Sequence, residues 1–378
     1  MVSDKGLNSK FSRRGLMKKG SIAAAAVPFA SKIVLGSGEN MVKLPKFVSG
    51  GEPTEYFKAP KEWDEHRKQA KHVQEKINDQ FGNAPNVIGL GLSQSKKTYG
   101  GKNGLKVTVR IDEEAERPPS ELPEQVEGIP IATEAGLKGN LGGCSVSNGT
   151  ENCVNKESDT TVNPGERINN GTAAMRMIDS NNDEYILTVA HLFESNCPND
   201  VNGQTATTAD GTKIGTVKYS NGVDDWAVVE LNSDGNTSAV IDDNADFPTC
   251  VDSVSEAYLQ EWESRWKSNR PCLYQMGCTT GKTSGRLKYA NYTESDFNCA
   301  TYDDDGSADG VYTYCGFGQG DSGGPTWHME NGNAHLVSTT AMYYGYSGSV
   351  CSGNDFGPDS SGFAAYAVED KLYGFIVD

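Results

Sequence analysis

The chain of 378 residues is long enough for two domains, and its 43 glycines favour a loop-rich β protein over a helical one. The net charge of −17 is uneven: residues 139–378 hold 34 acidic and 12 basic side chains, whereas residues 1–138 carry a net +5. So acidic a segment should be repelled by nucleic acids and anionic membranes, which excludes nucleic-acid binding as the expected function. No apolar stretch is long enough to cross a bilayer as a stable helix of the mature protein.

The N-terminal residues have the features of an export signal. Ser12, Arg13 and Arg14 begin a segment that resembles the twin-arginine signal, and a short apolar run follows at residues 22–29. We therefore expect residues 1–37 to be a twin-arginine signal peptide and the mature protein to be secreted. The alternative is an amphipathic or disordered N-terminal arm.

Residues 38–138 have the pattern of a small α+β domain. The spacing of the apolar residues in 62–81 predicts a helix with one apolar stripe, ended by Gly82. Three short strands are predicted next, at residues 87–92, 105–111 and 129–133. The last of these contains Pro130, which is typical of an edge strand at best.

All nine cysteines lie in the acidic part of the chain, between Cys144 and Cys351. No pair has the spacing of a zinc ribbon or finger, so disulfides formed in an oxidising compartment are predicted. Because nine is an odd number, at least one cysteine is expected to lack a partner within the mature chain.

Three motifs follow in the order His, Asp, Ser. Thr188-Val189-Ala190-His191 ends a predicted strand, Asp225 begins the apolar strand Trp226-Ala227-Val228-Val229, and Gly320-Asp321-Ser322-Gly323-Gly324-Pro325 forms a glycine-rich turn. Together they resemble the chymotrypsin/trypsin family of serine peptidases in its microbial form, over residues 167–373. The Ser motif is highly specific, and the joint occurrence of all three carries the resemblance.

The resemblance implies an all-β catalytic domain of two six-stranded antiparallel barrels, over residues 139–378. It implies His191 as the general base, Asp225 as the residue that orients it and Ser322 as the nucleophile. The backbone N–H groups of Gly320 and Ser322 would form the oxyanion hole. No cofactor and no metal ion are expected.

The function that this predicts is a serine endopeptidase acting on polypeptides through an acyl-enzyme intermediate. Asp224 is a rival to Asp225, although the position of the following Ala227 favours Asp225. Two other functions stay open: a secreted binding or adhesion protein on a protease fold, and an esterase that uses the same three residues. A lost triad residue would have indicated the binding protein, and none is lost.

The region 38–138 is similar to a module that precedes trypsin-like domains in microbial proteins. Two interpretations are open: a pro-region that assists folding or masks the active site, and a permanent accessory domain. The twin-arginine route transports folded proteins, so a protease folded before export would need restraint. Intramolecular inhibition by the N-terminal region is therefore expected if this region is a pro-region.

Two details of the site stay open in the sequence. Family members often carry an arginine that neutralises the acid beside the nucleophile, but the corresponding position here is Gln275, which leaves Arg286 or a freed N-terminus as partner of Asp321. The resemblance places the specificity pocket between residues 315–320 and 336–344, flanked by a possible Cys315–Cys351 bridge. No acid is evident in 315–317, which favours apolar or aromatic substrates.

Overall fold

The computed structural model describes residues 40–114, 119, 121–141, 160–193, 199–233, 235–241, 248–295, 300–303, 306, 308–345, 348–350, 354–372 and 376–377. The predicted signal peptide lies outside these residues. Asn40–Asp378 forms one compact unit. In the part of the chain that is described, no helix is long and apolar enough to span a membrane.

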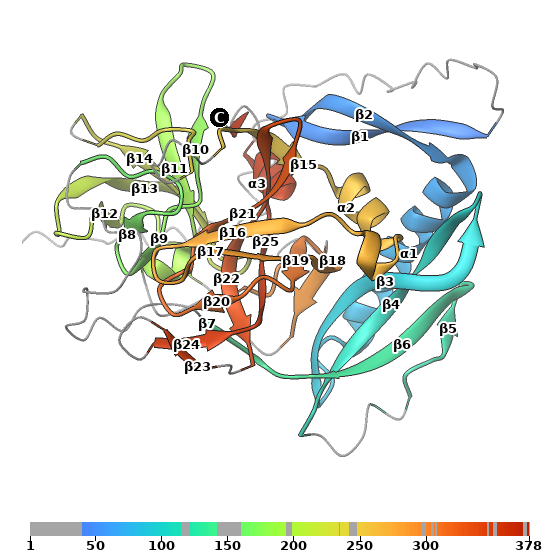
Figure 1. Cartoon of the computed structure of the whole chain (residues 1–378). Coiled ribbons are helices and arrows are strands. Elements are labelled where there is room, and N and C mark those ends of the chain that lie inside the picture. Colours follow the sequence, from blue (N-terminus) through green and yellow to red (C-terminus); the bar gives the residue numbers. More distant parts are fainter. Residues whose placement is uncertain are drawn as a thin grey trace, which may run out of the picture. The chain divides into compact units, whose positions relative to one another are not determined.

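The N-terminal region begins with a hairpin and a long helix. β1 (Met41–Ser49) and β2 (Glu52–Pro60) are antiparallel, and α1 (Lys61–Phe81) follows directly. The helix matches the prediction from the apolar spacing: its buried face includes Ala70, Val73 and Ile77, which pack against β3 (Val87–Tyr99) and β4 (Lys102–Asp112) (Figure 1). The hairpin before it was not predicted.

The three predicted strands of this region are confirmed as longer strands. β3 and β4 form a hairpin, and β6 (Ile129–Gly136) pairs in parallel with β4 from the Val107–Ile131 pair onward. Pro130 precedes that ladder, so its missing N–H costs no hydrogen bond to β4. Among the described strands, the two-residue strand β5 (Gln125–Val126) pairs with the other side of β6 and ends the sheet. β6 is therefore the second strand from the edge, next to the edge position predicted from Pro130.

The first half of the region predicted to be catalytic (residues 139–378, the catalytic region below) contains a six-stranded antiparallel sheet. The buried side chains of these strands belong to the main hydrophobic core. Its strands are, in spatial order, β12 (Thr205–Thr207), β13 (Lys213–Asn221), β14 (Trp226–Leu231), β11 (Glu184–Thr188), β10 (Met175–Ile178) and β26 (Ile376–Val377).

The strands of the second half are part of a larger sheet, and the predicted second barrel of six strands stays a prediction. The larger sheet has fifteen strands, because β18 pairs with β3 and β15 pairs with β1 of the N-terminal region. The catalytic-region strands in this sheet are β7 (Gly139–Leu141), β15 (Cys250–Val254), β16 (Leu273–Gly277), β17 (Gly281–Gly285), β18 (Leu287–Glu294), β19 (Gly310–Thr313), β21 (Pro325–Glu330), β22 (Asn333–Tyr344) and β25 (Asp359–Ala364).

Shorter elements complete the fold. The predominance of strands and the α+β character of the N-terminal region agree with the predicted fold class. These elements are β8 (Arg167–Ile168), β9 (Gly171–Thr172), β20 (Phe317–Gly318), β23 (Gly348–Val350), β24 (Asn354–Gly357), the helices α2 (Glu256–Glu263) and α3 (Ala365–Lys371), and the 3₁₀ turns η3 (Ala190–Leu192) and η4 (Lys267–Asn269).

A buried arginine joins the N-terminal region to the sheet of the catalytic region. Arg110 on β4 is 1% exposed, and its guanidinium lies 4.6 Å from the ring centre of Tyr312 and 4.8 Å from that of Tyr344. Its Nη1 donates to the Tyr292 hydroxyl at 2.6 Å, and both Tyr292 and Tyr344 donate to the Glu294 carboxylate. Residues from two parts of the chain thus bond to one another in a buried polar network.

Candidate active site

His191 and Asp225 lie at the same end of two neighbouring strands. β11 pairs with β14 through Thr188 and Ala227, so the turn η3 after β11 lies beside the residue that precedes β14. His191 Nδ1 lies 2.6 Å from Asp225 Oδ2, and the backbone N–H of His191 donates to Asp225 Oδ1 at 2.9 Å. Both oxygens of the carboxylate are therefore used to hold one histidine.

The backbone of Asp225 is held in an unusual conformation. Its φ is +59°, in the left-handed region that non-glycine residues seldom adopt, and its side chain is fully buried. The neighbouring Asp224 faces other partners, with its Oδ2 2.8 Å from Lys371 Nζ and 3.1 Å from Asn221 Nδ2. The two acids thus have different partners. In the hydrogen bonds of the described residues, Asp225 bonds to His191 and Asp224 does not.

The serine motif forms a tight turn between β20 and β21. The N–H of Gly324 donates to the carbonyl of Asp321 at 2.9 Å, and the N–H of Gly323 donates to Thr340 of β22 at 2.7 Å. A Cβ at Gly323 would lie 2.1 Å from the Thr172 carbonyl oxygen and 2.2 Å from Thr188 Oγ1, and its φ is +91°. Only glycine fits this position of the turn.

Two threonines connect this turn to the segment that carries His191. The Thr172 N–H donates to the Ser322 carbonyl at 2.7 Å, and Thr172 Oγ1 donates to the Gly320 carbonyl at 2.8 Å. Thr188, three residues before His191, donates from Oγ1 to the Thr172 carbonyl at 2.8 Å. Thr172 was missed in the sequence because nothing in its local pattern distinguishes it, whereas Thr188 belongs to the histidine motif.

The serine hydroxyl is directed to the neighbouring strand. Ser322 Oγ donates to the Ala341 carbonyl of β22 at 3.3 Å, while His191 Nε2 is buried and has no hydrogen-bond partner among the described residues. Ser322 is 0% exposed and the His191 side chain 5% exposed. Among the described residues no hydrogen bond joins Ser322 Oγ to His191 Nε2, and a proton transfer between the two atoms needs such a contact.

Asp321 is held by hydrogen bonds rather than by Arg286. Its Oδ1 accepts from the N–H groups of Thr279 and Thr280 at 2.9 and 3.0 Å, and its Oδ2 accepts from Thr280 Oγ1 at 2.5 Å and Gly318 N–H at 2.8 Å. Arg286 instead donates to the carbonyls of residues 267, 268 and 270. Burial raises the pKa of the Asp321 carboxyl to about 6, and the four hydrogen bonds limit the rise.

The predicted disulfides fall largely outside the described residues. The described cysteines are Cys250, Cys272, Cys278 and Cys315, and no disulfide joins any two of these four. The other five, including Cys351, lie outside the described residues, so the expected Cys315–Cys351 bridge is not described. Burial raises the pKa of the Cys315 thiol to about 12. A thiol that stays protonated is a poor nucleophile for disulfide exchange.

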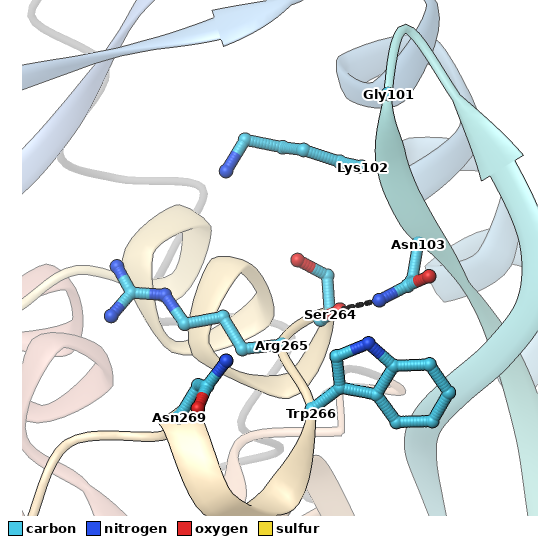
Figure 2. Close-up of a pocket in the computed structure, with 7 residues that line it drawn as sticks. All are labelled: Gly101, Lys102, Asn103, Ser264, Arg265, Trp266 and Asn269. Carbon is cyan, nitrogen blue, oxygen red and sulfur yellow. Dashed lines mark hydrogen bonds between the residues drawn. The ribbon is translucent and has the colours of Figure 1, made fainter.

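A cavity lies away from the histidine, aspartate and serine motifs. A cavity of about 330 Å³ lies between the β3–β4 turn and the end of α2, where Asn103 Nδ2 donates to the Ser264 carbonyl at 2.9 Å (Figure 2). Trp266 and Arg265 line it, and Trp266 is 62% exposed. None of the three motifs contributes to it, and the described residues contain no cluster of ligands for a metal ion.

One family model and several solved structures are similar to part of this chain. Residues 177–354 match the family model described as Trypsin, and this range includes all three motif residues. A search of curated proteins finds no match. Among solved structures, Nocardiopsis protease is similar at 14% identity and a TM-score of 0.39, with 57% of this chain and 98% of that chain covered.

Two other bacterial structures give similar values. Thermobifida fusca protease A matches at 14% identity and a TM-score of 0.36, covering 57% of this chain and 98% of that chain. Cellulomonas bogoriensis chymotrypsin matches at 16% identity and a TM-score of 0.36, covering 58% of this chain and 98% of that chain. The roles of His191, Asp225 and Ser322 are therefore inferred from the motifs and hydrogen bonds of this chain.

Proposed function

We propose that this chain, whose residues 177–354 carry a trypsin-family domain, is a serine endopeptidase with His191, Asp225 and Ser322 as its catalytic residues. The observation that carries the proposal is the contact of His191 Nδ1 with Asp225 Oδ2 at 2.6 Å, which leaves Nε2 available for a proton. In the neutral imidazole Nδ1 then donates to the carboxylate and Nε2 is the acceptor.

Peptide hydrolysis follows from these positions in two steps. Ser322 Oγ attacks the carbonyl carbon while His191 Nε2 takes its proton, and the same proton passes to the leaving amine as the C–N bond breaks. Water then attacks the acyl-enzyme and gives a proton to His191, and His191 passes this proton to Ser322 Oγ as the ester C–O bond breaks and the acid is released. Asp225 stabilises the imidazolium in both steps, and the N–H groups of Gly320 and Ser322 are proposed to stabilise the oxyanion.

We propose apolar or aromatic residues as the preferred substrates. Phe317 of β20 stacks with Tyr343 of β22 at 6.2 Å between ring centres, and Phe317 is fully buried. These rings belong to the two segments that flank the predicted specificity pocket. An aromatic lining without an acid favours apolar side chains over lysine or arginine.

For the N-terminal region we favour a permanent accessory domain over a pro-region that is shed. Separation of residues 40–136 would break the β3–β18 and β1–β15 ladders and expose Arg110 and its tyrosine partners. Exposing paired strand edges and a buried polar network is unfavourable. Residues 1–37 are proposed as a twin-arginine signal peptide, which makes the protein an exported one.

The proposal is tested by hydrolysis of a protein substrate and of a matched peptide amide and ester. We expect amide and ester hydrolysis that Ser322→Ala abolishes, with an unchanged melting temperature. Ester hydrolysis alone would favour the esterase, and a folded wild type that hydrolyses neither would favour the binding protein. Either of these outcomes would overturn the endopeptidase.

A further inference from the structure

The cavity between the β3–β4 turn and the end of α2 combines an exposed indole with two cations. Trp266 is more than half exposed, although a tryptophan ring is buried in most proteins. Figure 2 shows the amine of Lys102 and the guanidinium of Arg265 on one side of the cavity and the indole on the other. The cavity therefore offers an apolar ring and positive charge to the same ligand.

The two cations exceed the acid that they share. Lys102 Nζ pairs with Oε1 of Glu261, and Arg265 Nη2 lies 2.7 Å from Glu261 Oε2. Glu261 is buried, whereas both cations are partly exposed. One carboxylate balances one of the two charges, so a net positive charge faces the solvent. A guanidinium has five N–H donors, which lets Arg265 bind a second carboxylate beside Glu261.

The chain around Trp266 is basic within an acidic region. Residues 264–270 hold three of the twelve basic side chains of residues 139–378 and no acidic one. Arg286 adds a fourth cation, which donates to the carbonyls of residues 267, 268 and 270. These hydrogen bonds hold the loop in place before a ligand binds, which lowers the entropy lost on binding.

The loop lies within a limited distance of the candidate active site. Thr279 is ten positions after Asn269, and its N–H donates to Asp321 beside the nucleophile. An extended chain spans at most about 3.6 Å per residue, so Asn269 and Thr279 are at most about 36 Å apart. A substrate with about ten extended residues beyond the cleaved bond can contact both places. A dipeptide is shorter than β16 itself, which lies between them and rises about 13 Å.

We propose that this cavity is an exosite for the substrate, and that it binds an acidic polypeptide segment with an apolar or aromatic side chain next to its carboxylates. This inference rests on the proposed peptidase function and names a substrate class for it. The carboxylates bond to Arg265 and Lys102, and the apolar side chain covers the ring of Trp266. A sulfated polysaccharide fits less well, because its closely spaced anions need several unpaired cations.

Binding is measured on the full chain with Ser322→Ala, so that the peptide stays intact. The probe is a fluorescent peptide of about twenty residues, with alternating glutamate and phenylalanine in the half beyond the cleaved bond. In its counterpart each glutamate is replaced by glutamine. Trp266→Ala and Arg265→Gln are compared with the matched control Tyr56→Ala, because Tyr56 is a half-exposed aromatic residue on β2 that does not line the cavity.

We expect Trp266→Ala and Arg265→Gln each to raise the Kd of the acidic peptide about tenfold, because tryptophan and arginine contribute most at binding sites of this kind. Tyr56→Ala should leave the Kd unchanged. The glutamine peptide should bind about tenfold more weakly than the acidic one, and added salt should reduce this difference. Equal Kd values for the two peptides, or a Kd that Trp266→Ala does not change, would overturn the exosite.

Kinetics of the active chain separate this inference from the proposed function. Trp266→Ala should raise KM for the long acidic peptide about tenfold at unchanged kcat, and change neither constant for a dipeptide anilide. Hydrolysis of both substrates without any effect of Trp266→Ala would overturn the exosite and leave the peptidase intact. Absence of all hydrolysis would overturn the peptidase and its exosite together. A sulfated oligosaccharide that binds through Trp266 while the acidic peptide does not would also overturn the inference.

Discussion

The guanidinium of Arg110 lies on the ring of Tyr344, which ends the strand that carries the acceptor of the Ser322 hydroxyl. Arg110 belongs to the N-terminal region and Tyr344 to β22, so the two parts of the chain meet at one end of the candidate active site. The same arginine holds the Leu137 carbonyl two residues before β7. The N-terminal region is therefore connected both to β22 and to the segment that leads into β7.

Arg110→Met should destabilise the protein strongly. Removing one partner of a buried charged network leaves the Glu294 carboxylate among tyrosines without its nearby cation, at a cost of about 3–5 kcal/mol in the free energy of unfolding. Arg176→Met is the matched control, because its pair with Glu184 at 2.8 Å is partly exposed and should contribute less than about 1 kcal/mol. Denaturant unfolding measures both, and equal effects would contradict the anchoring role of Arg110.

Asp225→Asn should lower kcat by about 10⁴-fold while the fold is retained. Asparagine tolerates the positive φ of this position but cannot hold the imidazole in the tautomer that the carboxylate selects. Asp224→Asn is the control, since Asp224 contacts Lys371 rather than His191. Steady-state kinetics of the two variants would contradict the assignment if Asp224→Asn lost as much activity as Asp225→Asn.

Glu369→Gln should stabilise the protein increasingly as pH rises. Burial raises the pKa of the Glu369 carboxyl to about 8, despite hydrogen bonds from Ser253 and from the N–H groups of Gly50 and Gly51. Because the pKa of this carboxyl is higher in the folded state, it ionises in the unfolded state at lower pH. The free energy of unfolding of the wild type therefore falls as pH rises from about 4.5 to 8. Glutamine lacks this ionisation, so the difference should reach a few kcal/mol above pH 8.

Thermal unfolding of wild type and Glu369→Gln between pH 5 and 9 measures this effect. We expect similar stability near pH 5 and a difference that grows steadily to pH 8. Glu330→Gln is a suitable control because this glutamate is partly exposed. A difference that does not depend on pH would contradict the ionisation of a buried Glu369.

Thr280→Val should weaken the support of the nucleophile turn. The variant loses the 2.5 Å hydrogen bond to Asp321 Oδ2 while the backbone donors at Thr279, Thr280 and Gly318 are retained. We expect a loss of about 1–3 kcal/mol in stability, because a buried acceptor loses a donor, together with a decrease in kcat. Ser284→Ala on the same hairpin is exposed and should change neither quantity.

The local parts of this structure could be predicted from the sequence, because they depend on short-range patterns. The apolar spacing predicted α1, alternation predicted β4, and three motifs selected His191, Asp225 and Ser322. The contact between His191 and Asp225 agrees with the motif pattern, and the separate partners of Asp224 agree with the choice of Asp225.

The long-range parts could not be predicted in this way. Arg110 lies in an alternating strand and gives no local sign that Tyr292, Tyr312 and Tyr344, about 180 to 230 residues further along the chain, surround it. Thr172 and the pairing of β7 with β22 likewise depend on how distant segments meet. Arg286 was one of two partners left open for Asp321, but it donates to backbone carbonyls instead. Thr279 and Thr280 supply hydrogen bonds to Asp321 through the backbone and a hydroxyl.

The central claim is that Ser322 is an activated nucleophile, and fluorophosphonate labelling of the folded full chain tests it most directly. We expect one phosphonyl group on Ser322, located by peptide mass spectrometry, in the wild type and in the exposed-site control Ser268→Ala, and none in Ser322→Ala or His191→Ala. Labelling that persists in Ser322→Ala, or a folded wild type that stays unlabelled, would contradict the account.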